Sequence, residues 1–172
     1  SISNVAVSYE TATLLILKEK SQNIADNIAS SAILEVDMDL LKSNDLKINK
    51  SKAINTANRI FEESYKNITS KSIYLNKPEL EIFVLNNPGE SCSVLGQTIY
   101  YEENPSVVIY TELSFKNDMI FYKDIKVRSV SRGRVNSTID DNIDHLGCIG
   151  GISLRLISSK YLYNRFLEFE NR

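Results

Sequence analysis

Glycine and proline are missing from the first 77 residues of this 172-residue chain. Both residue types interrupt regular structure and mark turns, so their absence favours long helices and their presence favours a turn-rich sheet. Every glycine and proline lies in the second part of the chain, at Pro78, Pro88, Gly89, Gly96, Pro105, Gly133, Gly147, Gly150 and Gly151. The sequence therefore predicts a helical N-terminal part followed by strands and turns.

Catalytic motifs are also missing from the sequence. The only histidine is His145, so the commonest acid and base at neutral pH is available once. The serines, Ser153 among them, lack a nucleophile-elbow pattern, and no glycine-rich phosphate loop follows a predicted strand. We therefore expect neither an enzyme nor a bound cofactor.

An excess of one charge is absent as well. The chain carries 20 basic and 22 acidic residues, which gives a formal net charge of −2. This balance gives no electrostatic reason to expect nucleic acid as a partner. No apolar run approaches the roughly 20 residues needed to cross a bilayer. Because the chain begins at Ser1 rather than at methionine, we expect an upstream segment, and a membrane anchor could belong to it.

The two cysteines, Cys92 and Cys148, lie far apart in the sequence. They fit either an extracytoplasmic disulfide or two unrelated buried thiols, and the sequence leaves both readings open. A zinc site formed by these thiols and His145 would lack paired-ligand spacing and a fourth ligand. We therefore predict no zinc.

An acidic cluster near residue 140 resembles the first half of a calcium loop, because Asp140, Asn142 and Asp144 occupy alternate positions. The second half does not fit. The sixth position of such a loop requires glycine and holds His145, and the twelfth requires glutamate and holds Gly151. A solvated acidic loop is the favoured interpretation, and no metal is expected.

A long amphipathic helix is predicted from about Tyr9 to Leu41. Its apolar residues follow three-and-four spacing, which only Ser21 interrupts. Thirty-odd residues would form a rod of roughly 50 Å, longer than the roughly 40 Å diameter of a compact domain of this size. We expect one end to overhang the body; the alternative is a break near Ala25 to Ser31 that gives two packed helices. The stripe consists of Leu14, Leu17, Ala25, Ile28, Ala32 and Val36.

A polar interruption at Ser43, Asn44 and Asp45 should end this arm. A second amphipathic helix should then run from about Lys50 to Lys66, with Ala53, Ala57, Ile60, Phe61 and Tyr65 on its apolar face. We therefore divide the chain into an N-terminal helical arm, residues 1–47, and a head of helix and sheet, residues 48–172, which together form one continuous unit.

Beyond Pro78 the apolar period drops to two residues, which is typical of strands. Pro88 and Gly89 predict a turn, and Gly96 suggests a bulge inside the second strand. The resulting fold class is α+β, with a long N-terminal helix and a second helix packed on an antiparallel meander, as in pilins. The predicted strands are 80–84, 92–102, 106–115, then, after a hairpin loop at 116–118, a return through 119–122 and 124–131, and finally 152–157.

The stretch Gln22-Asn23-Ile24-Ala25-Asp26-Asn27-Ile28-Ala29 resembles the segment after the membrane helix in TadE/TadG-like proteins of tight-adherence (Flp-type) pili. That family typically reads glutamine, asparagine, alanine, alanine, aspartate, alanine, alanine there. The likeness extends from Leu14 to Arg134 through the second helix and the strands 107–115 and 125–132, and no counterpart exists for the tail from Val135. The matching residues are Gln22, Asn23, Ala25, Asp26 and Ala29, whereas Ile24, Asn27 and Ile28 depart from the alanine-rich pattern.

The resemblance implies a structural minor pilin or pseudopilin at the bacterial surface, with a hydrophobic anchor before Ser1 and other subunits as partners. The small residues of the helix would permit close packing against neighbours. The predicted subunit-packing face comprises Leu14, Leu17, Ala25, Ile28, Ala29 and Ala32. Alternatively, the C-terminal part of this stripe packs on the protein's own sheet.

An alternative function is an extracytoplasmic ligand-sensing domain of a membrane receptor, which also begins with a membrane-proximal helix. A small enzyme is the weakest alternative, because no set of convergent acids and bases exists in the sequence.

Overall fold

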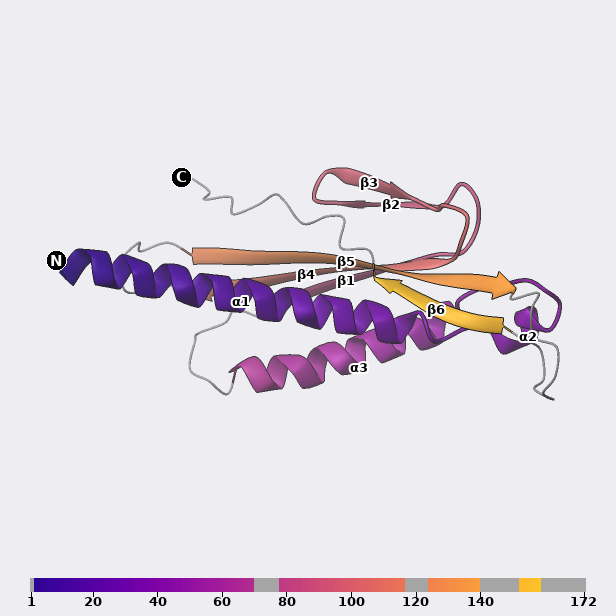
Figure 1. The fold of residues 1–172 in the computed structure, drawn as a ribbon, viewed down its shortest axis with the longest axis horizontal. Coiled ribbons are helices and arrows are strands. Elements are labelled where there is room, and N and C mark those ends of the chain that lie inside the picture. Colours follow the sequence, from indigo (N-terminus) through magenta and orange to yellow (C-terminus); the bar gives the residue numbers. More distant parts are fainter. Residues whose placement is uncertain (1, 70–77, 117–123, 140–151, 159–172) are drawn as a thin grey trace.

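The computed structural model of the protein describes residues 2–69, 78–116, 124–139 and 152–158. Three helices and six strands make up this part of the chain (Figure 1). The helices are α1 (Ile2–Ala32), α2 (Met38–Leu41) and α3 (Lys50–Thr69). The strands are β1 (Glu79–Leu85), β2 (Ser91–Val94), β3 (Gln97–Tyr100), β4 (Ser106–Lys116), β5 (Asp124–Ile139) and β6 (Ile152–Ser158).

The main sheet is antiparallel and has the strand order β1-β4-β5-β6. In its register, Ile82 of β1 lies opposite Ile109 of β4, which in turn lies opposite Ser131 of β5. Strands β2 and β3 leave this sheet and form a separate hairpin. The predicted α+β class with an antiparallel sheet is thereby confirmed. The meander is interrupted, because β1 pairs with β4 rather than with the next strand along the chain.

The main core lies between the helices and one face of the sheet. Helix α1 lies against β4 and β5, and α3 packs against α1 and β1. The alternating residues Val107 and Ile109 of β4 are fully buried against these helices. The core draws on residues of both the predicted arm and the predicted head, so the two share one hydrophobic interior. Its buried members are Ala25, Ile28, Ala29, Ala32, Ile33, Val36, Ile48, Ala53, Ala57, Val107, Ile109 and Val135.

The hairpin covers part of the opposite face of the sheet, above β5 in Figure 1. Cys92 and Val94 of β2 point inward and are buried with Val108 and Tyr110 of β4. This second cluster is smaller than the first and borders on charged side chains. The sheet therefore has an apolar face under the helices and a mixed face under the hairpin.

The prediction of one helix to Leu41 is wrong at its C-terminal end. Helix α1 ends at Ala32, and the chain then forms an antiparallel bridge between Val36 and Ile48. Asp37 next caps the short helix α2, because its carboxylate accepts hydrogen bonds from the Asp39 and Leu40 amides. The alternative break near Ala25 to Ser31 is also wrong, since α1 continues through those residues.

The prediction of one bulged strand from Cys92 to Glu102 is also wrong. The segment folds as the β2–β3 hairpin, with a two-residue turn at Leu95 and Gly96. Both residues have positive φ, 52° and 74°, as a two-residue hairpin turn of type I′ requires. The usual Asn-Gly signal is absent, because leucine occupies the first turn position.

The other predicted elements within the described residues are present, but β5 continues to Ile139, eight residues beyond the predicted end at Ser131. The polar interruption at residues 43–45 is a turn, in which Asn44 adopts a positive φ of 59°. Helix α3 begins at Lys50 because the Asn49 side chain accepts a hydrogen bond from the Lys52 amide, at 3.1 Å. The last predicted strand corresponds to β6. Of the predicted hairpin loop at 116–118, Lys116 belongs to β4, and the rest lies outside the described residues, as does the predicted return through 119–122.

Candidate functional site

Helix α1 changes surroundings along its length, and this change defines the candidate site. From Ser21 to Ala32 its apolar stripe faces the sheet, and Ala25, Ile28, Ala29 and Ala32 are at most 1% exposed. These four residues of the predicted subunit-packing face therefore lie in the protein's own core. The prediction that they meet a partner is wrong for this half of the helix, and the alternative of packing on its own sheet holds.

The buried half of α1 approaches β5 closely at Gly133. A Cβ atom added to Gly133 would lie 2.8 Å from Cγ2 of Ile33 and 2.9 Å from the carbonyl oxygen of Ala29. A side chain does not fit there without a shift of the helix, because both distances are shorter than ordinary van der Waals contacts. Small residues on both sides, alanine on α1 and glycine on β5, permit this approach.

Two polar contacts fix the helix at the start of the buried half. Ser129 of β5 donates a hydrogen bond from its hydroxyl to the buried Ser21 hydroxyl at 2.8 Å. Gln22 donates from Nε2 to the Val130 carbonyl at 3.1 Å and to Asp26 Oδ1 at 3.0 Å. Ser21, which interrupts the apolar stripe in the sequence, therefore has a buried partner across the helix–sheet interface.

N-terminal to Ser21, two large apolar side chains of α1 are exposed. Leu15 is 58% exposed and Ile16 is 52% exposed. The N-terminal turns of the helix extend beyond the start of β5, as Figure 1 shows. Leu17 is half-buried, whereas the side chain of Leu14 lies outside the described residues. The expected overhang of the rod is therefore present at the N-terminal turns. Leu15 and Ile16 are large apolar side chains of the same half that the described residues leave uncovered.

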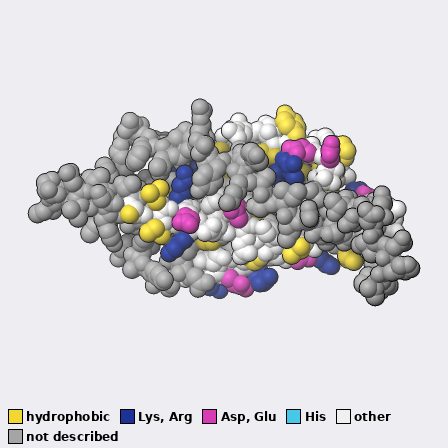
Figure 2. Space-filling model, viewed as in Figure 1, with side chains coloured by type: hydrophobic (Ala, Val, Ile, Leu, Met, Phe, Trp, Pro, Cys, Tyr) yellow, Lys and Arg dark blue, Asp and Glu magenta, His cyan; other side chains and the backbone are white. Residues whose placement is uncertain are grey.

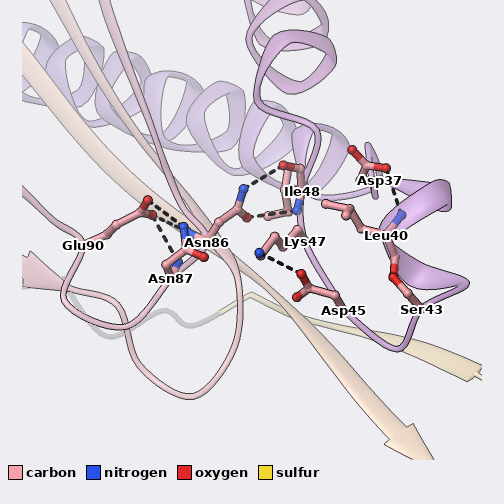
Figure 3. A network of polar contacts seen from close by, with 9 residues as sticks. All are labelled: Asp37, Leu40, Ser43, Asp45, Lys47, Ile48, Asn86, Asn87 and Glu90. Atoms are coloured by element: carbon pink, nitrogen blue, oxygen red, sulfur yellow. Dashed lines mark hydrogen bonds and ion pairs between the residues drawn. The ribbon is translucent and has the colours of Figure 1, made fainter.

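A second feature is a polar network that joins the β1–β2 turn to the segment before α3 (Figure 3). The side chain of Asn86 accepts a hydrogen bond from the Ile48 amide at 2.9 Å and donates to the Ile48 carbonyl at 2.8 Å. Glu90 accepts from the backbone amides of Asn86 and Asn87, and its other carboxylate oxygen lies 3.3 Å from Lys50 Nζ.

This network sets the protonation state of Glu90. Partial burial alone would raise the pKa of Glu90, but the hydrogen bonds from Asn86, Asn87 and Lys50 outweigh it and lower the pKa from 4.5 to about 2. The carboxylate is therefore ionised over the physiological range and holds the turn in one conformation.

A third feature is a charged cluster on the face of the sheet opposite the helices. Glu112 of β4 is buried and lies 2.7 Å from Arg128 Nε and 3.0 Å from Lys126 Nζ. The Tyr110 hydroxyl also donates to it, at 2.8 Å. Burial alone would raise the pKa of Glu112, but these partners outweigh it and lower the pKa to about 2.

An open groove of about 880 Å³ lies between the β1–β2 turn and the loop that follows β3. At its base, Glu102 lies 3.0 Å from Nη1 of the buried Arg132 and 2.6 Å from Nη1 of Arg134. Arg132 also donates to the Tyr100 carbonyl at 2.9 Å, which ties the end of β3 to the sheet. The lining residues are Pro88, Gly89, Tyr101, Glu102, Glu103, Asn104 and Arg134.

The remaining sequence predictions concern residues that the structure does not bring together. Cys92 is buried under the hairpin and burial raises the pKa of its thiol, but Cys148 lies outside the described residues. The disulfide therefore stays a prediction. The acidic cluster Asp140, Asn142 and Asp144, together with His145, lies outside the described residues as well. Within the described part of the chain, no group of three metal-ligating side chains occurs.

Sequence reasoning missed the groove and both charged networks. The acidic and basic partners in these networks lie on different segments of the chain, so a single sequence does not pair them. On the face in Figure 2, basic and acidic side chains of the described residues are interspersed, and neither sign forms a large patch.

Comparisons with protein families, with curated proteins and with solved structures find no match to this chain. Among the helices that the structure describes, none is both long and apolar enough to span a membrane.

Proposed function

We propose that the chain is a structural pilin-like subunit, of the TadE/TadG-like kind, that acts by packing with other subunits at the bacterial surface. The observation that supports this proposal is the division of α1. One part anchors the helix to its own sheet, and the N-terminal turns extend past the start of β5 (Figure 1). In this N-terminal half, Leu15 and Ile16 are exposed to solvent.

The exposed half has the properties of a packing surface. Burying an apolar side chain contributes about 1.5 to 3 kcal/mol, so a partner that covers Leu15 and Ile16 gains free energy that the isolated chain lacks. A projecting helix also lets neighbouring copies approach without moving the sheet. In this role no substrate is turned over, and the contacts between subunits do the work.

The anchored half keeps this surface in a fixed orientation. The close contact at Gly133 and the hydrogen bonds of Ser21 and Gln22 join α1 to β5. Helix and sheet therefore move together, so contacts made by the projecting turns are transmitted to the displayed sheet. Localisation at the cell surface and a membrane anchor upstream belong to the same proposal.

Cysteine cross-linking in the producing cells tests this function. Ile16→Cys should give cross-linked species that contain two or more copies or another subunit, because the proposal places residue 16 in an interface. Leu34→Cys is the matched control, since Leu34 is 56% exposed but lies beyond the C-terminal end of α1. The unmodified chain controls for the native cysteines. Equal cross-linking of both variants, or none at residue 16, would contradict the proposal.

A further inference from the structure

We propose that the groove at the β1–β2 turn is a binding site for an oxyanion group, a carboxylate or a phosphate, which Arg134 holds at its base. The site is independent of the packing surface on α1. It lies between the β1–β2 turn and the loop after β3, and its inferred ligand is a small or terminal anionic group.

The charge at the base of the groove favours an anion. Two guanidinium groups, Arg132 and Arg134, share the single carboxylate of Glu102. These three groups carry a net charge of +1, and Glu103 elsewhere on the lining brings the groove as a whole to neutral, so the positive charge is local to the arginines. An incoming oxyanion would balance it, and a guanidinium binds a carboxylate or phosphate through two parallel hydrogen bonds.

Arg134 has donors to spare. A guanidinium carries five N–H donors, and among the described residues Arg134 has one ion-pair partner, which Nη1 contacts. Its Nε is buried without a hydrogen-bond partner there. The side chain is 31% exposed and lines the groove, so an anion can reach its outer nitrogen atoms with little rearrangement.

Both walls of the groove are held in place before any ligand arrives. The Glu90 carboxylate fixes the turn that contains Pro88 and Gly89. The Tyr101 amide donates to the Glu90 carbonyl at 2.8 Å and joins the two walls. On the other side, Arg132 binds Glu102 and the Tyr100 carbonyl. A site with pre-formed walls loses less conformational entropy on binding, which favours even a small ligand.

The Tyr101 ring and the Glu103 carboxylate limit what can enter. Tyr101 contributes to the lining, and Glu103 places a negative charge there. A strongly polyanionic ligand would meet repulsion there. A single carboxylate or phosphate group on a small or peptide-like molecule fits the arrangement better.

The test is a titration of the ¹⁵N-labelled chain, followed by NMR, with sodium acetate, sodium phosphate or sodium chloride at matched ionic strength. We expect acetate or phosphate to produce saturable shifts of the Arg134 Nε–Hε peak and of the Tyr101 and Glu102 amides. Chloride should not do so. A larger response to acetate identifies a carboxylate ligand, and a larger response to phosphate identifies a phosphate group.

Three variants separate this site from general anion effects. Arg134→Gln should weaken binding at least tenfold, and Arg134→Lys should keep part of it, because a lysine retains the charge but not the two-pronged geometry. Arg59→Gln is the control, since Arg59 is an exposed arginine on α3 whose partner is Glu63. Shifts that match those in chloride, or that persist in Arg134→Gln, would overturn the proposal.

Discussion

Ile28 and Ile16 lie on the same helix, twelve positions apart, in opposite surroundings: Ile28 is fully buried and Ile16 is 52% exposed. The buried half of α1 uses small residues beside Ile28, and these let the helix approach Gly133 of β5. The projecting half presents the larger Leu15 and Ile16 instead. The comparison shows that one helix carries both buried and exposed large apolar side chains, because Leu15 and Ile16 lie outside the three-and-four spacing of the buried stripe.

The largest expected effect separates these two isoleucines. Ile28→Ala should lower the free energy of unfolding by about 3 kcal/mol, because it removes buried methyl and methylene groups and leaves a cavity. Ile16→Ala, the matched substitution in the projecting half, should change it by less than about 0.5 kcal/mol. Chemical denaturation of both variants measures the difference. Similar losses at both positions would show that the projecting half belongs to the core.

Acid should weaken the folded domain that holds the buried half of α1. The pKa of Glu112 is lower in the folded state, at about 2, than its ordinary value of 4.5. Its contribution is therefore present above pH 4.5 and disappears as the pH falls through this range toward 2, at a cost of about 3 kcal/mol. Thermal unfolding between pH 6 and pH 2 measures this loss.

Glu112→Gln gives the control for that titration. The variant should be less stable than the wild type at neutral pH, and its stability should fall less between pH 4.5 and 2. Some pH dependence should remain, because Glu90 has a similarly lowered pKa of about 2. An unchanged acid limb in Glu112→Gln would contradict the role given to the Glu112 cluster.

A substitution at Gly133 tests the close approach of helix and strand. Gly133→Ala should destabilise the fold by about 1 to 3 kcal/mol, because the added methyl group overlaps Ile33 and the Ala29 carbonyl. In the double variant with Ile33→Ala, the total loss should be smaller than the sum of the two single-variant losses, because the overlap with the Ile33 side chain is gone. Strictly additive losses would show that the two residues do not compete for space.

The smallest expected effect concerns the buried hydroxyl pair. Ser21→Ala should cost about 1 kcal/mol, because it leaves the Ser129 hydroxyl buried without its acceptor. Adding Ser129→Ala should recover part of this loss. Urea denaturation of the single and double variants gives the coupling energy, and a value near zero would mean that the hydrogen bond does not hold the helix.

Local patterns in the sequence were sufficient to predict helix α3 and most strands. Two patterns match buried faces in the structure: the helical spacing of Ala53 and Ala57, and the alternation in β4. The end of α1 was not predictable in this way. Its position depends on the bridge between Val36 and Ile48, which joins residues that are distant along the chain.

The candidate site was predictable only in part. The stripe on α1 was visible, but a single sequence does not show whether the protein's own sheet or a partner covers it. The groove depends on Glu102 and Arg134, which lie on separate segments and meet only in the folded chain. The leucine at the β2–β3 turn gave no hairpin signal, since its positive φ is rare for such a residue.

Hydrogen exchange along α1 tests the central claim most directly. In the isolated chain, amides from residue 21 to 32 should exchange only when the whole domain unfolds, because that half is packed against β4 and β5. Amides of the projecting turns before residue 15 should exchange orders of magnitude faster through local fraying of the helix. Equal protection along the entire helix would contradict the account.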